Sequence, residues 1–253
     1  MKHYSLQGNQ LTATDGRFYW NEERGAWVPS VTTVLDAYPK PYALLQWMKE
    51  VGAKADDVII AAGKRGTSVH NMTESYDRGE EVTLMNDAGH LNCSLEEWAM
   101  FERWVEFSRT VGPTWSEIER QYIGDEYAGT VDRVGYVPGV GHCLIDIKTS
   151  NGIWDTYWLQ LAAYHQLVRQ QRSADLHAIQ AVGILWLNAK TRGPGRGGAI
   201  QGAGWQLVTL PVGPAVTEQM DTFRAVQHLW KAGKDFAKAP RETVYTIRHR
   251  KDG

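Results

Sequence analysis

The sequence predicts an α/β fold, in which a central mixed sheet is flanked by helices and preceded by a helical N-terminal part. Two observations support this prediction. The first 110 residues carry mainly helical patterns, whereas the chain after them carries three consecutive strand patterns, a helix, two more strands and a last helix. This order of elements is typical of an α/β core built on a mixed sheet.

Length and composition are those of an ordinary globular chain of 253 residues, with 43% apolar and 22% charged residues. We expect a single domain over residues 1–253, made of an N-terminal hairpin and helical part (1–112), an α/β core (113–232) and a basic C-terminal tail (233–253). The longest apolar run, Ala181 to Leu187, is too short to span a bilayer, and the N-terminus lacks a signal-peptide pattern. The sequence therefore predicts a cytoplasmic protein with no membrane partner.

Cysteine and charge counts restrict the chemistry. The two cysteines, Cys93 and Cys143, are too few for a disulfide framework, a four-cysteine zinc site or an iron–sulfur cluster, so a metal would need oxygen or histidine ligands. The formal net charge is −2, from 27 basic and 29 acidic residues. This charge argues against a protein that coats nucleic acid through its overall charge.

Local patterns predict the elements of the N-terminal part. Aromatic residues on both sides of a polar turn predict a hairpin over residues 17–28. Helices are predicted to follow, and their starts are marked by a capping serine, a proline in the first turn or a capping box. These helices are expected to begin at Ser30, near Pro41, near Ala55 and at Ser94.

The core begins after Gly112-Pro113 with three strand patterns separated by glycine-containing turns. An amphipathic helix follows, with an apolar stripe through Trp154, Trp158, Leu161 and Val168. The expected ranges are 115–123, 128–137 and 142–149 for the first three strands, 153–172 for the helix, 179–188 and 205–210 for the later strands, 190–204 for a glycine-rich loop and 214–232 for the last helix.

Acidic residues lie inside three neighbouring strand patterns. In the third strand, the alternation of side chains places Asp146 and Lys148 on one face. The second strand contains Asp132, and the first offers Glu117 and Glu119, which alternation places on a shared face. Three carboxylates near the middle of a sheet repel one another unless a divalent cation lies between them. Such oxygen ligands select Mg²⁺ or Mn²⁺, as one or two ions.

Lys148 beside such a site is suited to phosphodiester hydrolysis. A lysine can orient or deprotonate the attacking water and can neutralise charge on the transition state. Gln160 and Tyr164, one helical turn apart, are expected where the next helix meets the acidic part of the sheet. Taken singly, these residues also fit a structural ion-pair network, a packed tyrosine and a solvated glutamine.

The same residues belong to an ordered set of motifs, and with this set the chain resembles the PD-(D/E)xK nuclease superfamily, in its RecB-like exonuclease branch, over about residues 28–170. Two N-terminal motifs are similar to segments of phage-type and mitochondrial genome maintenance exonucleases. Val131 stands where the superfamily name has proline, and the lack of four cysteines removes the iron–sulfur subgroup. The motifs are Pro29-Ser-Val-Thr-Thr-Val-Leu35, Arg65-Gly-Thr-Ser-Val-His70, Gly129-Thr-Val-Asp132, Asp146-Ile-Lys148 followed by Thr149, and Gln160-x-x-x-Tyr164.

The resemblance implies a PD-(D/E)xK nuclease core and a metal site within it. Asp132 and Asp146 would bind the metal together with the backbone carbonyl of Ile147. Lys148 would be the catalytic lysine. His70 would stand near the metal on an N-terminal helix, although a single histidine in a helix is more often packed or solvated than a ligand.

The resemblance also implies supporting residues. Glu119 would be the acid of the first strand, which assists metal binding or the attacking water, with Glu117 as its rival. Gln160 and Tyr164 would support the active site and the DNA backbone.

Basic and aromatic residues are candidates for contacts with DNA. No acidic residue occurs from Leu176 to Thr217, a stretch that includes the basic glycine-rich loop. Ordinary solvated charge is an equally good interpretation of that loop. Trp20, Trp27, Trp154 and Tyr157 would stack on unpaired bases if they are exposed. The candidate phosphate-binding residues are Lys64, Arg65, Lys190, Arg192 and Arg196.

We therefore expect a Mg²⁺- or Mn²⁺-dependent deoxyribonuclease that acts as an exonuclease and hydrolyses linear DNA from its ends. The sequence leaves open whether this exonuclease prefers single strands. One alternative is a structure- or site-specific endonuclease on the same core. Another is a non-catalytic nucleic-acid-binding module on a decayed nuclease fold, which the intact set of Asp132, Asp146 and Lys148 argues against. The resemblance further implies a place in DNA repair or recombination, with a replication or recombination protein as a candidate partner and the oligomeric state open.

Overall fold

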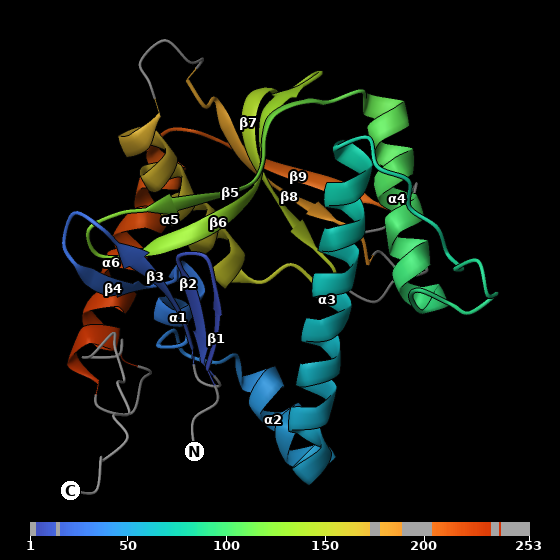
Figure 1. Cartoon of the computed structure of the whole chain (residues 1–253). Coiled ribbons are helices and arrows are strands. Elements are labelled where there is room, and N and C mark those ends of the chain that lie inside the picture. The colour runs from blue at the N-terminus through green and yellow to red at the C-terminus, as the bar shows by residue number, and fades with distance from the viewer. Residues whose placement is uncertain (1–3, 14–15, 173–177, 189–203, 234–237, 239–253) are drawn as a thin grey trace, which may run out of the picture.

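The computed structural model describes residues 4–13, 16–172, 178–188, 204–233 and 238 (Figure 1). In these residues it shows a small N-terminal sheet beside a five-stranded mixed sheet that has helices on both faces. The predicted α/β class, with a mixed sheet flanked by helices, is therefore confirmed.

The N-terminal segment forms an antiparallel four-stranded sheet rather than a hairpin alone. β3 and β4 are the predicted hairpin, across which the rings of Trp20 and Trp27 lie 5.4 Å apart. The sequence does not predict β1 and β2, because these four-residue segments are largely polar and show no clear alternation. The expectation of mainly helical structure is wrong for these residues. The strands are β1 (Tyr4–Gln7), β2 (Gln10–Ala13), β3 (Gly16–Asn21) and β4 (Ala26–Pro29).

Three helices and a short 3-10 turn follow the small sheet. Ser30 caps the first helix as predicted, because its hydroxyl accepts a hydrogen bond from the Thr33 N–H. Pro41 lies at the N-cap of the second helix rather than inside its first turn. In Figure 1, α2 and the adjoining end of α3 extend away from both sheets. The elements are α1 (Val31–Leu35), α2 (Tyr42–Val51), the 3-10 turn (Gly52–Lys54) and α3 (Ala55–Asp77).

α4 (Leu95–Val111) lies beside α3 and has the predicted capping box. The Ser94 hydroxyl accepts a hydrogen bond from the Glu97 N–H, and the Glu97 carboxylate accepts one from the Ser94 N–H. The helix ends at Gly112, whose φ of 68° is a left-handed conformation that glycine adopts without steric cost.

The main sheet has the strand order β5-β6-β7-β8-β9. Neighbouring strands are antiparallel except for β7 and β8, which are parallel because a helix connects them as a crossover. All five strands lie within about two residues of their predicted ranges. They are β5 (Thr114–Ile123), β6 (Ala128–Val137), β7 (Gly141–Lys148), β8 (Ala181–Trp186) and β9 (Gln206–Pro211).

Helices cover both faces of the main sheet (Figure 1). α5 (Asp155–Gln171), α6 (Pro214–Ala232) and α1 pack on one face, whereas α4 and the C-terminal part of α3 pack on the other. Along β7, Leu144 belongs to the core under α5 and Ile145 to the core under α4, so alternation sorts the side chains as predicted. None of the helices in the described residues combines the length and apolar character needed to cross a membrane.

β6 and β7 separate at their acidic residues. The ladder of paired residues ends with Arg133 opposite Ile145, one position before Asp132 and Asp146 would pair. In place of the ladder, Asp132 Oδ2 accepts a hydrogen bond from the Ile147 N–H at 2.7 Å. The interruption thus gives the Asp132 carboxylate access to the backbone of β7 in the middle of the sheet.

Candidate metal centre

His70, Glu119 and Asp132 converge from α3, β5 and β6. His70 Nδ1 lies 3.6 Å from Glu119 Oε1 and 3.7 Å from Asp132 Oδ2. One ligand atom from each of the three residues lies within 4.8 Å of the other two. Two carboxylates and an imidazole at these distances can hold one divalent cation.

The backbone of Glu119 directs its side chain toward this cluster. Its φ of 49° makes it the one non-glycine residue with positive φ in the described parts of the chain, a conformation that costs about 1–3 kcal/mol. It interrupts the alternation of β5, so the expectation that Glu117 and Glu119 share a face is wrong. Glu117 instead accepts a hydrogen bond from Tyr122 and pairs with Arg172 Nε at 3.0 Å.

Burial and mutual repulsion disfavour the negative charges of the cluster. Burial is the main cause that raises the pKa of Asp132, against the opposing charge of His70. Burial also raises the pKa of Asp146 to about 6, although Lys148 acts in the opposite direction. Burial alone would lower the pKa of His70, but the surrounding carboxylates raise it to about 9. The buried carboxylates thus favour a neighbouring positive charge, which a protonated His70 or a bound divalent cation would supply.

Asp146 and Lys148 form a hydrogen-bonded group with residues of α5. Asp146 Oδ2 lies 2.5 Å from Lys148 Nζ, and Asp146 Oδ1 accepts a hydrogen bond from Gln160 Nε2 at 3.0 Å. Gln160 also accepts a hydrogen bond from Lys148 Nζ at 3.0 Å and donates one to the Tyr164 hydroxyl at 3.1 Å. Gln160 is buried rather than solvated. Tyr157, whose ring lies 4.4 Å from Lys148 Nζ, completes this group.

His70 is oriented by the backbone of β7. Its Nε2 lies 3.0 Å from the carbonyl oxygen of Ile147, which leaves Nδ1 facing Glu119 and Asp132. Metal-binding histidines characteristically donate their second N–H to a carbonyl or carboxylate in this way. The Ile147 carbonyl, which the resemblance implies as a metal ligand, contacts His70 Nε2 in this structure instead of facing Glu119 and Asp132.

Arg133, which is not among the predicted site residues, lies behind the cluster with its side chain completely buried. Its Nη1 donates to Glu119 Oε1 at 3.2 Å. On the other side, its Nε donates to Asp77 at 2.7 Å and its Nη2 to Thr73 at 3.1 Å, both on α3. Arg133 thus ties the helix that carries His70 to the strand that carries Glu119. The signal in the sequence is a second charged residue directly after Asp132 in an apolar strand.

The predicted phosphate-binding residues fall into two groups. Lys64 and Arg65 lie on α3 before His70, where Lys64 is exposed and Arg65 Nη1 lies 3.6 Å from Glu96 of α4. Both are therefore on the helix that enters the candidate metal centre. The remaining predicted residues lie outside the described part of the chain: Lys190, Arg192 and Arg196.

Gly129 makes room for Tyr164, because an added Cβ would lie 2.4 Å from Tyr164 Cε1. We expect Gly129→Ala to displace that ring, to lower the free energy of unfolding by about 1–3 kcal/mol and to slow any reaction at the site. Urea unfolding measures the first effect. Gly63→Ala is the control, because nothing lies within 4 Å of its added Cβ, and alanine in an exposed helix stabilises by about 0.5–1 kcal/mol. Equal stability of the two variants would contradict this prediction.

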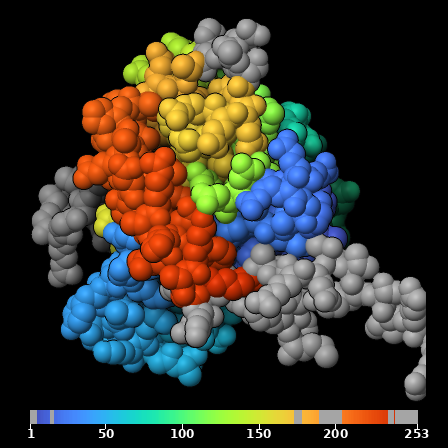
Figure 2. Space-filling model, turned by 90° about the vertical axis from the view of Figure 1, so that its left-hand side faces the viewer, coloured from blue at the N-terminus to red at the C-terminus, as the bar shows by residue number. Residues whose placement is uncertain are grey.

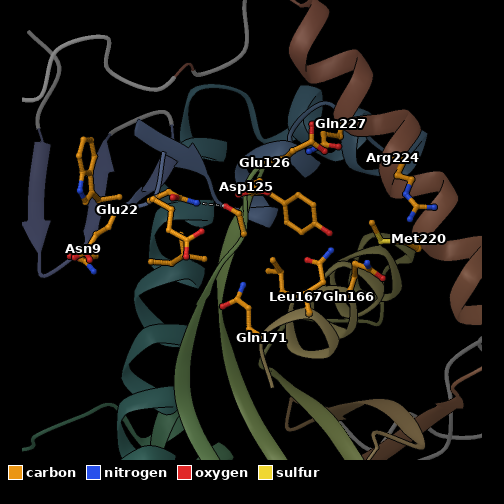
Figure 3. A pocket seen from close by; sticks show the side chains of 17 residues that line it. Asn9, Glu22, Asp125, Glu126, Gln166, Leu167, Gln171, Met220, Arg224 and Gln227 are labelled. Atoms are coloured by element: carbon orange, nitrogen blue, oxygen red, sulfur yellow. Dashed lines mark hydrogen bonds between the residues drawn. The ribbon is translucent and has the colours of Figure 1, made fainter. Parts of the chain in front are cut away.

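A cleft of about 890 Å³ lies apart from these residues, between the small sheet, the turn that joins β5 to β6, and helices α5 and α6. Figure 2 shows this side of the molecule, and Figure 3 shows Glu22, Asp125 and Glu126 among its lining side chains. Among the described residues, none of the predicted catalytic, metal-binding or phosphate-binding residues lines it, whereas Trp20, a candidate for base stacking, does. The described acidic residues of the cleft do not bring three ligand atoms together, whereas His70, Glu119 and Asp132 do, so the candidate site is the cluster around His70.

Comparisons with known proteins add one observation. No family model matches the chain, and no curated protein matches it. Among solved structures, a protein from Eubacterium rectale described as "Putative exonuclease" is similar, with 11% sequence identity, a TM-score of 0.40, and coverage of 73% of this chain and 77% of that chain. The function proposed below therefore rests on the geometry of the site.

Proposed function

We propose that this chain is a metal-dependent DNA nuclease that degrades linear DNA from its ends. The observation that supports it most is the cluster of His70, Glu119 and Asp132 where β6 and β7 separate, with Asp146 and Lys148 beside it on β7. Carboxylates that surround a cation site next to a lysine are suited to hydrolysis of a phosphodiester. Mg²⁺ or Mn²⁺ is the expected ion, because most of these ligands are carboxylate oxygens.

Each group then has a distinct role. A cation held by His70, Glu119 and Asp132 would bind a phosphate oxygen and make the phosphorus more electrophilic. Lys148 Nζ is held in place by its contacts with Asp146 and Gln160. Burial alone would lower the pKa of Lys148, but the neighbouring carboxylates raise it. Lys148 therefore stays protonated, and we assign it to positioning the attacking water and neutralising charge that develops on the phosphate.

We expect His70→Ala to raise the Mg²⁺ concentration for half-maximal cleavage by at least about 10-fold, because one ligand of the cation is lost. The rate at saturating Mg²⁺ should fall less, since both carboxylates remain. Cleavage rates across a Mg²⁺ titration measure this effect. His228→Ala, at an exposed position of α6, is the matched control and should leave the titration unchanged. Superimposable titrations for His70→Ala and the unmodified chain would remove His70 from the site.

The decisive experiment compares end-labelled single-stranded DNA, end-labelled duplex and covalently closed circles, each with Mg²⁺, Mn²⁺ or EDTA. We expect degradation of linear DNA with either metal, intact circles, and no reaction in EDTA. Cleavage of circles would favour the endonuclease alternative. Binding without cleavage would favour the non-catalytic module, and neither binding nor cleavage would contradict the proposal.

A further inference from the structure

Trp154 differs from every other tryptophan of the chain in its exposure. All eleven tryptophans lie in described residues, and ten of them are buried or half-buried. Trp154 is 48% exposed, so it does not belong to the apolar stripe that the sequence predicts for this helix. We propose that Trp154 is a stacking platform for an unpaired base of the DNA strand held at the candidate metal centre, an inference that rests on the proposed function.

Neither packing nor helix capping explains a tryptophan at this position. Trp154 is the N-cap residue of α5 and makes no side-chain capping hydrogen bond. Serine, threonine, aspartate or asparagine would stabilise the helix here, because their side chains accept hydrogen bonds from the first free N–H groups. An indole cannot do so, since its nitrogen only donates. The position thus carries a large exposed ring where the fold would favour a small polar side chain.

The loop before α5 supports this ring from one side. Gly152 lies against the six-membered part of the indole, where an added Cβ would be 3.7 Å from both Cη2 and Cζ2. The loop is itself held in place, because the Ser150 hydroxyl donates to the Gly152 carbonyl at 2.8 Å and the Trp186 indole N–H donates to the Ser150 carbonyl at 2.7 Å. A ring supported in this way loses little conformational freedom when a base stacks on it.

Trp154 also lies at the end of α5 that faces the catalytic lysine. Tyr157 is three residues further along the helix, and its ring lies 4.4 Å from Lys148 Nζ. Trp154 is the N-cap of the helix whose first turn carries Tyr157, so the indole lies within one turn of a ring that contacts Lys148. A base next to the scissile phosphate is therefore the expected partner of the indole.

Stacking on an indole requires a free base face. Each base of a single strand can offer one, whereas a blunt duplex covers every base face except the outer faces of its two terminal pairs. The proposal therefore identifies the substrate class as DNA with unpaired bases at the reacting end. Basic residues that contact phosphate do not distinguish these two forms in this way.

The test measures the dissociation constants of three fluorescein-labelled probes by anisotropy with Ca²⁺ in place of Mg²⁺, which keeps a divalent cation among the carboxylates, and gel electrophoresis checks that the probes stay intact. The probes are oligothymidylate, a strand of equal length with abasic sites, and a blunt duplex. Trp154→Ala should weaken oligothymidylate binding by about 5- to 150-fold and leave the other two probes unchanged. Trp154→Phe should retain part of the affinity because it keeps a ring. Tyr136→Ala, which removes an exposed aromatic ring from β6, is the control and should change nothing.

Two results would overturn the inference. One is an equal dissociation constant of Trp154→Ala and the unmodified chain for oligothymidylate. The other is an equal loss of affinity for the abasic strand, which would mean that the ring positions the backbone rather than a base. If the unmodified chain cleaves DNA in Mg²⁺, either result removes only the stacking role. An unmodified chain that neither binds nor cleaves DNA contradicts the proposed function together with this inference.

Discussion

Lys148→Ala is expected to lower the rate of DNA cleavage by about 10³-fold or more while DNA binding persists. The ammonium group is held 2.5 Å from Asp146 Oδ2 and 3.0 Å from Gln160 Oε1, so its position does not depend on the substrate. Its charge matters most when negative charge develops on the phosphate, which happens in the transition state. Single-turnover cleavage of labelled single-stranded DNA measures the rate, and anisotropy measures binding.

Two further variants separate this effect from loss of structure. Asp146→Asn should also abolish cleavage. It leaves the Lys148 ammonium without its carboxylate, whereas Lys148→Ala leaves Asp146 without its cation, so the two variants unpair opposite charges. Lys231→Ala is the matched control, because within the described part of the chain this lysine pairs with Glu126 alone, and both side chains are about half exposed. Melting temperatures identify any variant that fails to fold. Full activity of either Lys148→Ala or Asp146→Asn would refute the assignment.

Arg133→Met is expected to lower the free energy of unfolding by about 3–5 kcal/mol, because it leaves partly or wholly buried carboxylates without their cation. The guanidinium contacts Asp77 and Glu119, whose side chains are 5% and 19% exposed, and it lies 5.1 Å from the ring of Trp104. For a chain of this length the loss corresponds to roughly 6–20 °C in melting temperature. Urea and thermal unfolding both measure it.

Arg78→Met provides the matched control. Arg78 also pairs with a carboxylate of α3, Glu74 at 2.8 Å, but both side chains reach solvent. An exposed pair four residues apart on a helix contributes about 0.3–0.5 kcal/mol, so this variant should unfold almost as the unmodified chain does. Arg133→Lys should fall between the two, because lysine restores the charge without the forked geometry. A loss below about 1 kcal/mol for Arg133→Met would show that the buried network is not required.

The features that follow from local periodicity could be predicted from the sequence. β7 is a regular strand, so alternation alone places Asp146 and Lys148 toward α5 and Ile145 toward α4. The caps at Ser30 and Ser94 depend on residues within one helical turn and were equally predictable.

The features that depend on backbone irregularity or on distant parts of the chain could not be predicted in this way. The positive φ of Glu119 resets the alternation of β5, and no residue type near it signals that change. The contacts of Arg133 with Asp77 and Thr73 join segments more than fifty residues apart, which a local pattern cannot show. The position of His70 beside the carboxylates likewise results from how α3 packs on the sheet, and only the family resemblance indicated it.

The backbone of Glu119 also shows where stability and chemistry make opposite demands on one position. With φ at 49°, glycine would fit best and asparagine next, because any Cβ comes close to a backbone carbonyl oxygen and the short amide of asparagine offsets part of that cost through local hydrogen bonds. Selection for stability alone would favour one of those residues. Glutamate at this position lowers the stability of the backbone, but it places a carboxylate beside His70. The residue is therefore retained for its function and not for its conformational preference.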